Sequence, residues 1–195
     1  MLSQGFITKN PSRPAGYFNV RKQVKNLQAD YEQEWMNMIS NKQADEYYMQ
    51  QAIEMARKAP DFPFGAVIVR RTTGEIIAKG VNRSSENPIF HGEIDAINSC
   101  AAVNPSIDWS EFDLYTTAEP CPMCQSAIEW AGISTIYYGT SIPYLQSLGW
   151  WQIGIRAEEV SRRTPFRQST VIAGILELEC NALFEAAGTG SARLK

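Results

Sequence analysis

The residues with the clearest chemical potential are one histidine and a pair of cysteines. His91 is the only histidine in the chain, and Glu93 follows it two positions later. Cys121 and Cys124 lie about thirty positions further on, in the run Pro120-Cys121-Pro122-Met123-Cys124. Imidazole nitrogen and thiolate sulfur are donors that zinc prefers, and a catalytic zinc keeps three protein ligands and one open position. His91, Cys121 and Cys124 would supply three ligands, which leaves Glu93 without a place in the coordination sphere.

A zinc ion with an open position gives Glu93 a role. The metal lowers the pKa of a bound water from about 15.7 to near 7, and the resulting hydroxide is a nucleophile at neutral pH. A carboxyl group in the same cavity can take up the proton and return it to a leaving amine. Two plainer interpretations compete with this one. The cysteines could be a redox pair, and Glu93 could be a first-turn glutamate favoured by the helix dipole.

Composition narrows the class of protein. The chain has 195 residues, which suits one domain with an extra segment, and its net charge is −3. Without a strong positive field, long-range attraction to nucleic acid is weak, so we expect no nucleic-acid partner. No apolar run approaches the ~18 residues of a membrane span, and no signal peptide begins at Met1. We therefore expect a cytoplasmic protein without a membrane partner.

The first forty residues differ from the rest of the chain. Residues 1–19 are polar and contain prolines, which favours an arm without regular structure. From about Val20, apolar residues recur at helical spacing as far as Met38, and we expect this stripe to be packed in a core. A second helix is expected after Asn41, with its end before Pro60. The domain bounds predicted from these changes are 1–40 for an N-terminal extension, 41–187 for the main domain and 188–195 for a polar tail.

The main domain alternates between strand and helix patterns. Strands are expected at 64–69, 76–81, 114–117, 133–138 and 171–172, and helices at 91–102, 121–131, 143–148 and 174–187. The charged stretch between the last short helix and the last strand is expected to be an irregular connection. This order predicts an α/β fold whose sheet is largely parallel, covered by helices on both faces, with an antiparallel edge from the first hairpin. His91 and both cysteines then lie at helix starts, where free N–H groups lower thiol pKa values.

The combination of His-x-Glu with Pro-Cys-x-x-Cys resembles the known signature of zinc-dependent nucleobase deaminases. The chain is similar to the cytidine and nucleoside deaminase superfamily from about Asp45 to Ala187. The resemblance implies a cytidine-deaminase-like three-layer α/β/α sandwich with a central mixed five-stranded sheet. It also implies one Zn²⁺ per subunit on His91, Cys121 and Cys124, Glu93 as the catalytic acid and base, and a homodimer.

Residues around this signature help to choose among the branches of the superfamily. Phe64, in Pro63-Phe64-Gly65-Ala66-Val67, and Trp130, in Ala127-Ile128-Glu129-Trp130-Ala131, resemble pocket aromatics of bacterial guanine deaminases. Asn82 resembles an asparagine that hydrogen-bonds the base in several branches. Phe64 and Trp130 could instead be core residues, and Asn82 could be a turn residue.

Other stretches depart from the guanine deaminase pattern. Where that branch carries acidic residues after a Gly-aromatic pair, Gly149-Trp150 is followed by Trp151-Gln152, and Glu158 or Glu159 is a possible substitute. The run from Val171 to Phe184 is closer to the ending of tRNA adenosine deaminases.

The sequence therefore predicts a zinc-dependent aminohydrolase that acts on a free purine base or a purine-like aminoheterocycle, with guanine to xanthine plus ammonia as the first choice. Two alternatives stay open: a tRNA-specific adenosine deaminase, and a non-catalytic zinc-containing partner subunit.

Overall fold

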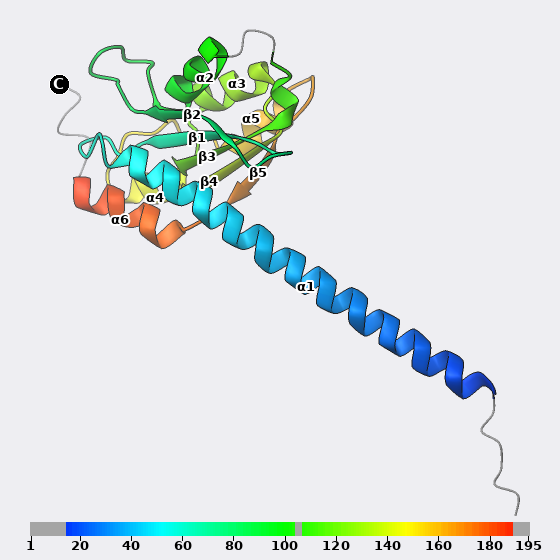
Figure 1. Ribbon diagram of the computed structural model, residues 1–195. Helices are drawn as coiled ribbons and strands as arrows, with labels where there is room; N and C mark the ends of the chain where they lie inside the picture. Colours follow the sequence, from blue (N-terminus) through cyan, green and yellow to red (C-terminus); the bar gives the residue numbers. More distant parts are fainter. Residues whose placement is uncertain (1–14, 104–106, 189–195) are drawn as a thin grey trace, which may run out of the picture. The chain divides into compact units, whose positions relative to one another are not determined.

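The computed structural model describes residues 15–103 and 107–188 (Figure 1). The chain forms two compact units, Met1–Lys42 and Gln43–Lys195. The helices are α1 (Ala15–Ala56), α2 (Gly92–Val103), α3 (Pro122–Ala131), α4 (Ile142–Ser147), α5 (Ala157–Arg163) and α6 (Glu177–Ala187), with a 3₁₀ turn at Trp109–Glu111. The strands are β1 (Gly65–Arg70), β2 (Ile76–Val81), β3 (Phe112–Ala118), β4 (Thr135–Thr140) and β5 (Thr170–Ala173).

The five strands form one mixed sheet in the order β2-β1-β3-β4-β5. β1 pairs antiparallel with both β2 and β3, whereas β3, β4 and β5 are parallel to one another. The antiparallel part is larger than the sequence predicted, because β1 inserts between β2 and β3 as well as forming the hairpin. Since parallel strands end at the same edge, the loops that follow β3 and β4 meet there, which is where open α/β sheets build their sites.

Alternate residues of the strands build the two halves of the core. On β1, Ala66 and Ile68 face a cluster that includes Ala96 and Cys100 of α2, while Val67 and Val69 face a cluster that includes the C-terminal part of α1. This alternation is the two-residue period of a sheet covered on both faces. The result is a three-layer sandwich, with α2 and α3 on one face and α6 on the other (Figure 1), and it confirms the predicted fold class.

Four expectations about individual elements are wrong. α1 is one continuous helix where two were expected, because neither glycine nor proline interrupts it after residue 16. Met38, expected in a core, is 53% exposed, and residues 15–19 are helical. The charged stretch at 157–163 forms the helix α5. Its first turn is acidic and its last turn is basic, and both interact favourably with the helix dipole. The rest of the expected arm, 1–14, lies outside the described residues, and the predicted domain bounds stay a prediction.

A close backbone approach holds α2 against β2. A Cβ atom added at Gly80 would lie 2.1 Å from the carbonyl oxygen of Gly92 and 2.4 Å from the nitrogen of Ala96. We expect Gly80→Ala to lower the free energy of unfolding by about 3 kcal/mol, since α2 has to move away from the sheet. Urea unfolding measures this. Gly154→Ala is the control: its added Cβ would find its nearest neighbour at 3.5 Å, and we expect a change within about 0.5 kcal/mol. Equal effects of the two substitutions would contradict the packing argument.

Among the described residues, no helix has the length and apolar character required to cross a membrane.

Candidate active site

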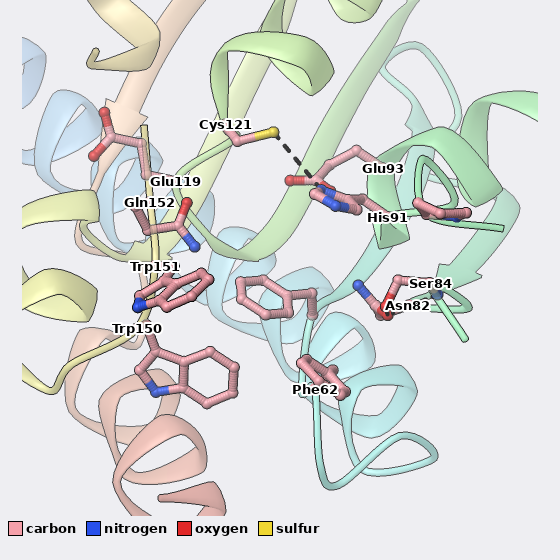
Figure 2. Close-up of a pocket in the computed structure, with 12 residues that line it drawn as sticks. Phe62, Asn82, Ser84, His91, Glu93, Glu119, Cys121, Trp150, Trp151 and Gln152 are labelled. Atoms are coloured by element: carbon pink, nitrogen blue, oxygen red, sulfur yellow. Dashed lines mark hydrogen bonds between the residues drawn. The ribbon is translucent and has the colours of Figure 1, made fainter. Parts of the chain in front are cut away.

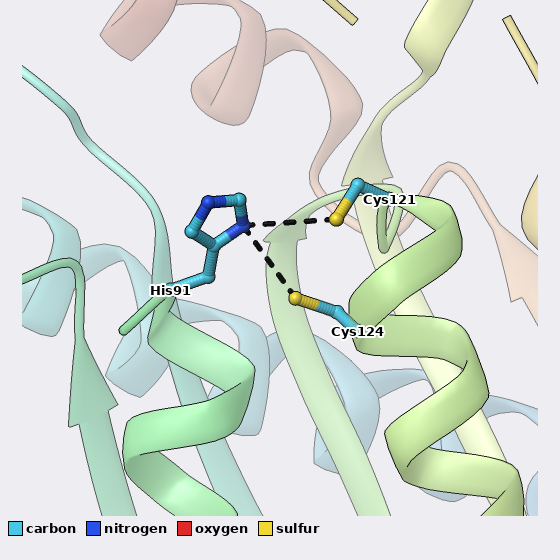
Figure 3. Close-up of side chains that lie close together, drawn as sticks. All are labelled: His91, Cys121 and Cys124. Atoms are coloured by element: carbon cyan, nitrogen blue, oxygen red, sulfur yellow. Dashed lines mark hydrogen bonds between the residues drawn. The ribbon is translucent and has the colours of Figure 1, made fainter. Parts of the chain in front are cut away.

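Two helix starts bring the sequence motif together. His91 directly precedes α2, and its carbonyl oxygen accepts the N–H of Asp95. Cys121 is the residue that caps α3, and Cys124 lies in the first turn of that helix. The chain reaches Cys121 directly from the end of β3, through Glu119 and Pro120. Figure 3 shows both sulfur atoms directed at the same edge of the imidazole ring.

The three donor atoms have the spacing that a tetrahedral zinc requires. Nδ1 of His91 lies 3.7 Å from Sγ of Cys121 and 3.6 Å from Sγ of Cys124, and the donor atoms all lie within 4.8 Å of one another. Zn–S bonds of about 2.3 Å and Zn–N bonds of about 2.0–2.1 Å, at the tetrahedral angle, place sulfur and nitrogen roughly 3.5 Å apart. The residues therefore fit zinc, and they are positioned to bind one metal ion.

Electrostatics within the cluster favour a thiolate at Cys121. The pKa of Cys121 is lowered to about 4, first by the hydrogen bond from the Cys124 thiol and then by His91 and the backbone N–H of Cys124. The same bond to Cys121, together with burial, raises the pKa of Cys124. The hydrogen bond to Cys121 also raises the pKa of His91. The backbone N–H at the start of α3 thus contributes to the lowered pKa of Cys121, but less than the Cys124 thiol and His91 do, and the pKa of Cys124 is raised instead of lowered.

A cavity of about 240 Å³ opens beside this cluster (Figure 2). Three of its lining residues, His91, Glu93 and Cys121, belong to the motif. The other lining residues come from the loops after α1, β2, β3 and α4: Phe62, Phe64, Asn82, Ser84, Pro88, Glu119, Trp150, Trp151 and Gln152. The structure thus brings Phe64, Asn82 and Glu93 together around one space next to the donor triad.

Glu93 presents a carboxyl group to this cavity from the first turn of α2. It is only 3% exposed, and Thr116 donates a long hydrogen bond of 3.4 Å to its Oε1. Burial is the main cause that raises the pKa of Glu93, followed by the negative charge of Cys121. A raised pKa brings a carboxyl group closer to the range in which it both accepts and donates a proton near neutral pH.

Asn82 is held in a fixed orientation by its neighbour Ser84. Its Oδ1 accepts the backbone N–H of Ser84 at 3.0 Å and the Ser84 hydroxyl at 2.7 Å. Because a backbone N–H can only donate, this contact identifies which end of the amide is oxygen. Figure 2 shows the amide nitrogen directed into the cavity. Asn82 can therefore be both a turn residue and a binding residue, the two alternatives that the sequence left open. Its oxygen accepts the hydrogen bonds of the turn, and its nitrogen stays available to a ligand.

Phe64 and Trp130 occupy different places. The Phe64 ring packs against Trp150 and Phe184, with centroid distances of 5.6 and 4.9 Å, and also forms a wall of the cavity. Trp130 lies outside the cavity of its own chain. Its side chain is 78% exposed and its ring packs on Phe166 at 4.8 Å. The substrate-binding role expected for Trp130 is therefore not supported by the fold of one chain.

Glu119 is a pocket residue that the sequence reasoning missed. Its carboxylate is 3% exposed and accepts bonds from Nε of Arg156 at 2.7 Å and from the backbone N–H groups of Ile142 and Ala157, both at 2.9 Å. It thereby joins the end of β3 to the starts of α4 and α5. The sequence does contain a signal for this role, because Glu119 directly follows a buried strand and directly precedes Pro120-Cys121.

The loop after α4 supplies the other side of the cavity, through Trp150, Trp151 and Gln152. Neither Glu158 nor Glu159, the possible substitutes for the acidic residues, reaches the cavity within one chain. Both lie in the first turn of α5 and neither lines the cavity, and Glu159 pairs with Arg163 at 2.7 Å. The amide side chain of Gln152 lines this side of the pocket, where the guanine deaminase pattern has an acidic residue.

Comparison with known proteins agrees with this site. Residues 42–140 match the family described as the cytidine and deoxycytidylate deaminase zinc-binding region. A tRNA-specific adenosine deaminase of Rickettsia bellii is 40% identical over 90 residues, which are 45% of this chain and 62% of that protein. The guanine deaminase of Bacillus subtilis is 38% identical over 117 residues, covering 56% of this chain and 72% of that protein. The tRNA-specific enzymes are the more numerous of the two kinds.

Solved structures resemble the whole domain. A guanine deaminase from Nitrosomonas europaea superposes with a TM-score of 0.64 at 28% identity, over 73% of this chain and 83% of that one. A related structure, with a TM-score of 0.65, is a complex with 8-azaguanine. The stretch that matches the family, residues 42–140, contains the donor triad, and the solved structures share the fold. The chain therefore belongs to the cytidine and deoxycytidylate deaminase family of zinc-dependent aminohydrolases.

Proposed function

We propose that this deaminase acts on a free purine base, with guanine as the first substrate, and that the products are xanthine and ammonia. The observation that carries the proposal is the lining of the cavity. Aromatic rings form its walls, Glu93, His91 and Cys121 form its end, and no lysine or arginine lines it among the described residues. A nucleotide or a nucleic acid would be expected to meet cationic residues beside such a pocket, because phosphate contacts dominate its affinity.

The dimensions and polar groups of the cavity suit a single heterocycle. A volume of about 240 Å³ lies below the roughly 300–1,000 Å³ of pockets for drug-sized ligands. Phe64 and Trp151 offer aromatic surface for stacking, and Asn82 offers an N–H donor to a ring acceptor. Gln152 offers both a donor and an acceptor, which suits the mixed donor and acceptor edge of guanine. The 8-azaguanine complex of a related protein supports a purine base in this place.

The reaction requires one carboxyl group that moves two protons. Zinc, when bound, supplies a hydroxide nucleophile at neutral pH by lowering the pKa of its water. Glu93 takes up the proton that the water loses and delivers it to the ring nitrogen as oxygen adds to the amine-bearing carbon. It then protonates the amino group from the second water proton, so that the C–N bond breaks and ammonia leaves. We propose that Asn82 and the aromatic walls orient the base during these steps.

Deamination of tRNA adenosine is the second candidate, because the similar tRNA-specific enzymes are more numerous. The cavity does not favour it, since the lining lacks cationic residues. The third possibility, a partner subunit without activity, does not account for a buried carboxyl group at the end of the cavity. The homodimer and the cytoplasmic location stay predictions of the sequence.

One panel of substrates separates these functions. The zinc-loaded chain is assayed for ammonia release from guanine, cytosine, adenine, their nucleosides and an adenosine-containing tRNA hairpin. We expect turnover of guanine, with little dependence on salt. Turnover of the hairpin alone, with an affinity that falls steeply as salt rises, would establish the tRNA function instead. No ammonia from any substrate would favour the partner subunit.

One substitution at Asn82 and one at Ser84 separate an effect on substrate binding from an effect on the stability of the turn. Asn82→Asp keeps the oxygen that accepts both bonds from Ser84 but loses the N–H donor that faces the cavity. We expect kcat/KM for guanine to fall about 10- to 100-fold, because a buried acceptor of the base is left unpaired. Steady-state kinetics and thermal unfolding measure the two effects. Ser84→Ala is the control, since it removes one turn contact and leaves the donor. A larger loss of activity in Ser84→Ala than in Asn82→Asp would contradict a binding role for Asn82.

A further inference from the structure

The proposed reaction depends on a fixed separation between Asn82 and Glu93. Asn82 would donate to the base, and Glu93 would carry protons to the same base. The two residues belong to different elements, since Asn82 follows β2 and Glu93 lies in the first turn of α2 (Figure 2). In such an arrangement a displacement of about 1 Å can lower the rate about a hundredfold. The contacts that join these two elements beside the cavity therefore bear on catalysis.

The side chain of Asp95 joins α2 to both neighbours of Asn82 in the chain. Asp95 is buried and lies two positions after Glu93. Its Oδ2 accepts the backbone N–H of Val81 at 3.1 Å, and its Oδ1 accepts Nη2 of Arg83 at 2.5 Å. Because Asn82 lies between these two residues, a single carboxylate holds the chain immediately before it and immediately after it.

The contact with Val81 follows from the place of β2 at the edge of the sheet. The N–H of Asn82 points inward and donates to the carbonyl oxygen of Phe64 at 3.0 Å. Successive N–H groups of a strand point to opposite sides, so the N–H of Val81 points to the open edge, where Asp95 accepts it. Asn82 is thus held from two sides, through its own N–H and through the residue before it.

Arg83 extends the same attachment to the loop after β2. Its guanidinium group pairs with Asp95, lies 3.6 Å from the carboxylate of Glu86 and stands over the ring of Phe90 at 5.3 Å. Its backbone N–H donates to the carbonyl oxygen of Phe90 at 2.8 Å. The loop that these contacts close leads directly into His91, so both ends of the loop are fixed against α2.

From these contacts we propose that Asp95 and Arg83 are positioning residues for deamination, which hold the amide of Asn82 at a fixed distance from the carboxyl group of Glu93. Neither Asp95 nor Arg83 lines the cavity, so they act through Asn82 and not on the base itself. The inference rests on the proposed function, because it requires Asn82 to bind the base. An ion pair whose arginine is 42% exposed contributes little to stability, so loss of the pair should affect activity more than folding.

Asp95→Asn in the full-length, zinc-loaded chain tests this role. The amide has one acceptor oxygen in place of two, so Val81 and Arg83 cannot both keep their partner. We expect kcat/KM for guanine to fall about tenfold.

The matched control is Asp113→Asn, because the Asp113–Arg71 pair lies at the other end of β3, away from the cavity. The side chains of Asp95 and Asp113 are 11% and 13% exposed, and those of their arginines are 42% and 49% exposed. We expect Asp113→Asn to leave kcat/KM within about threefold. Thermal unfolding checks that both variants are folded at the assay temperature. Equal losses of activity in the two variants would overturn the proposal.

A double-mutant cycle separates positioning from a general loss of structure. The Asn82→Asp chain lacks the donor that Asp95 positions, so adding Asp95→Asn should lower kcat/KM by less than about threefold further. Arg83→Gln should reproduce the loss of Asp95→Asn, and the two together should be no worse than either alone. A tenfold loss in both Asn82 backgrounds would show that Asp95 only supports the fold, and it would overturn the proposal. Full activity of Asp95→Asn would also overturn it, while the proposed function would stand if Asn82→Asp still lowers guanine turnover.

Hydrogen–deuterium exchange tests the attachment without a substrate. In Asp95→Asn the amide hydrogens of residues 81–90 should exchange about tenfold faster than in the original chain, and in Asp113→Asn their exchange should be unchanged. Unchanged exchange in Asp95→Asn would overturn the proposal, whichever base is the substrate. Inactivity of the original chain on guanine is a separate result: it would overturn the proposed function, and exchange would still decide whether Asp95 holds Asn82 in place.

Discussion

Replacing Glu93 by glutamine is expected to lower kcat by two to four orders of magnitude while the chain keeps its zinc. The substitution preserves the volume of a side chain that is 3% exposed and removes only its ability to carry a proton. Proton transfer by a positioned carboxyl group contributes about 10²- to 10⁴-fold. Glu119, the other carboxylate at the cavity, already accepts bonds from Arg156 and two backbone N–H groups, so it has little capacity to take over. Ammonia release measures kcat, and elemental analysis measures zinc per chain.

The buried carboxylate of Glu129 provides a matched control for this prediction. Glu129 is also 3% exposed, but it lies outside the cavity and accepts bonds from Gln125 at 2.8 Å and from the N–H of Ser169 at 3.1 Å. We expect Glu129→Gln to lower the free energy of unfolding by about 1–3 kcal/mol and to leave kcat within about threefold. Glu93→Gln should do the opposite, because its amide keeps an oxygen that can accept the 3.4 Å bond from Thr116 but cannot carry a proton. If Glu93→Gln keeps full activity with zinc bound, the assigned proton transfer is wrong.

The chemistry of the site was predictable from the sequence because its residues are close to helix starts. Two short motifs specify the local positions of His91, Glu93, Cys121 and Cys124, and one strand-to-helix connection for each motif places both at the same edge of the sheet. These features depend on neighbours in the sequence, which a pattern records directly.

The substrate side of the pocket depends on contacts that no local pattern records. Trp150, Trp151 and Gln152 reach the cavity because the loop after α4 folds back over it, beside Phe64. Glu119 joins three elements through Arg156, which lies 37 positions away in the chain. Trp130 was placed in the pocket by resemblance alone, and in the structure it lies on the outer surface of α3. A helical stripe also does not reveal what covers it, so the apolar face of α1 was assigned to the core.

Removing one thiolate should have the largest effect on both zinc binding and activity. We expect Cys124→Ser to reduce zinc from about one ion per chain to a small fraction of that, because only Cys121 and His91 remain as strong donors. Activity should fall roughly a thousandfold or more, which corresponds to about 4 kcal/mol of barrier. Zinc bound only by the folded chain also stabilises it, by about 2.7 kcal/mol when free zinc is a hundredfold above the dissociation constant. Thermal unfolding with and without zinc should therefore show a zinc-dependent rise in the original chain and almost none in Cys124→Ser.

Cys100→Ser is the matched control, since it removes a buried thiol from α2 that faces the core and not the donor triad. Burial of a hydroxyl group in that apolar cluster should lower stability, yet zinc content and the zinc-dependent rise in melting temperature should persist. The two cysteine variants thus separate loss of packing from loss of a ligand. If Cys124→Ser retains a full equivalent of zinc, or if Cys100→Ser loses it, the metal does not bind at His91, Cys121 and Cys124. The position of Glu93 beside these residues would then no longer explain the activity.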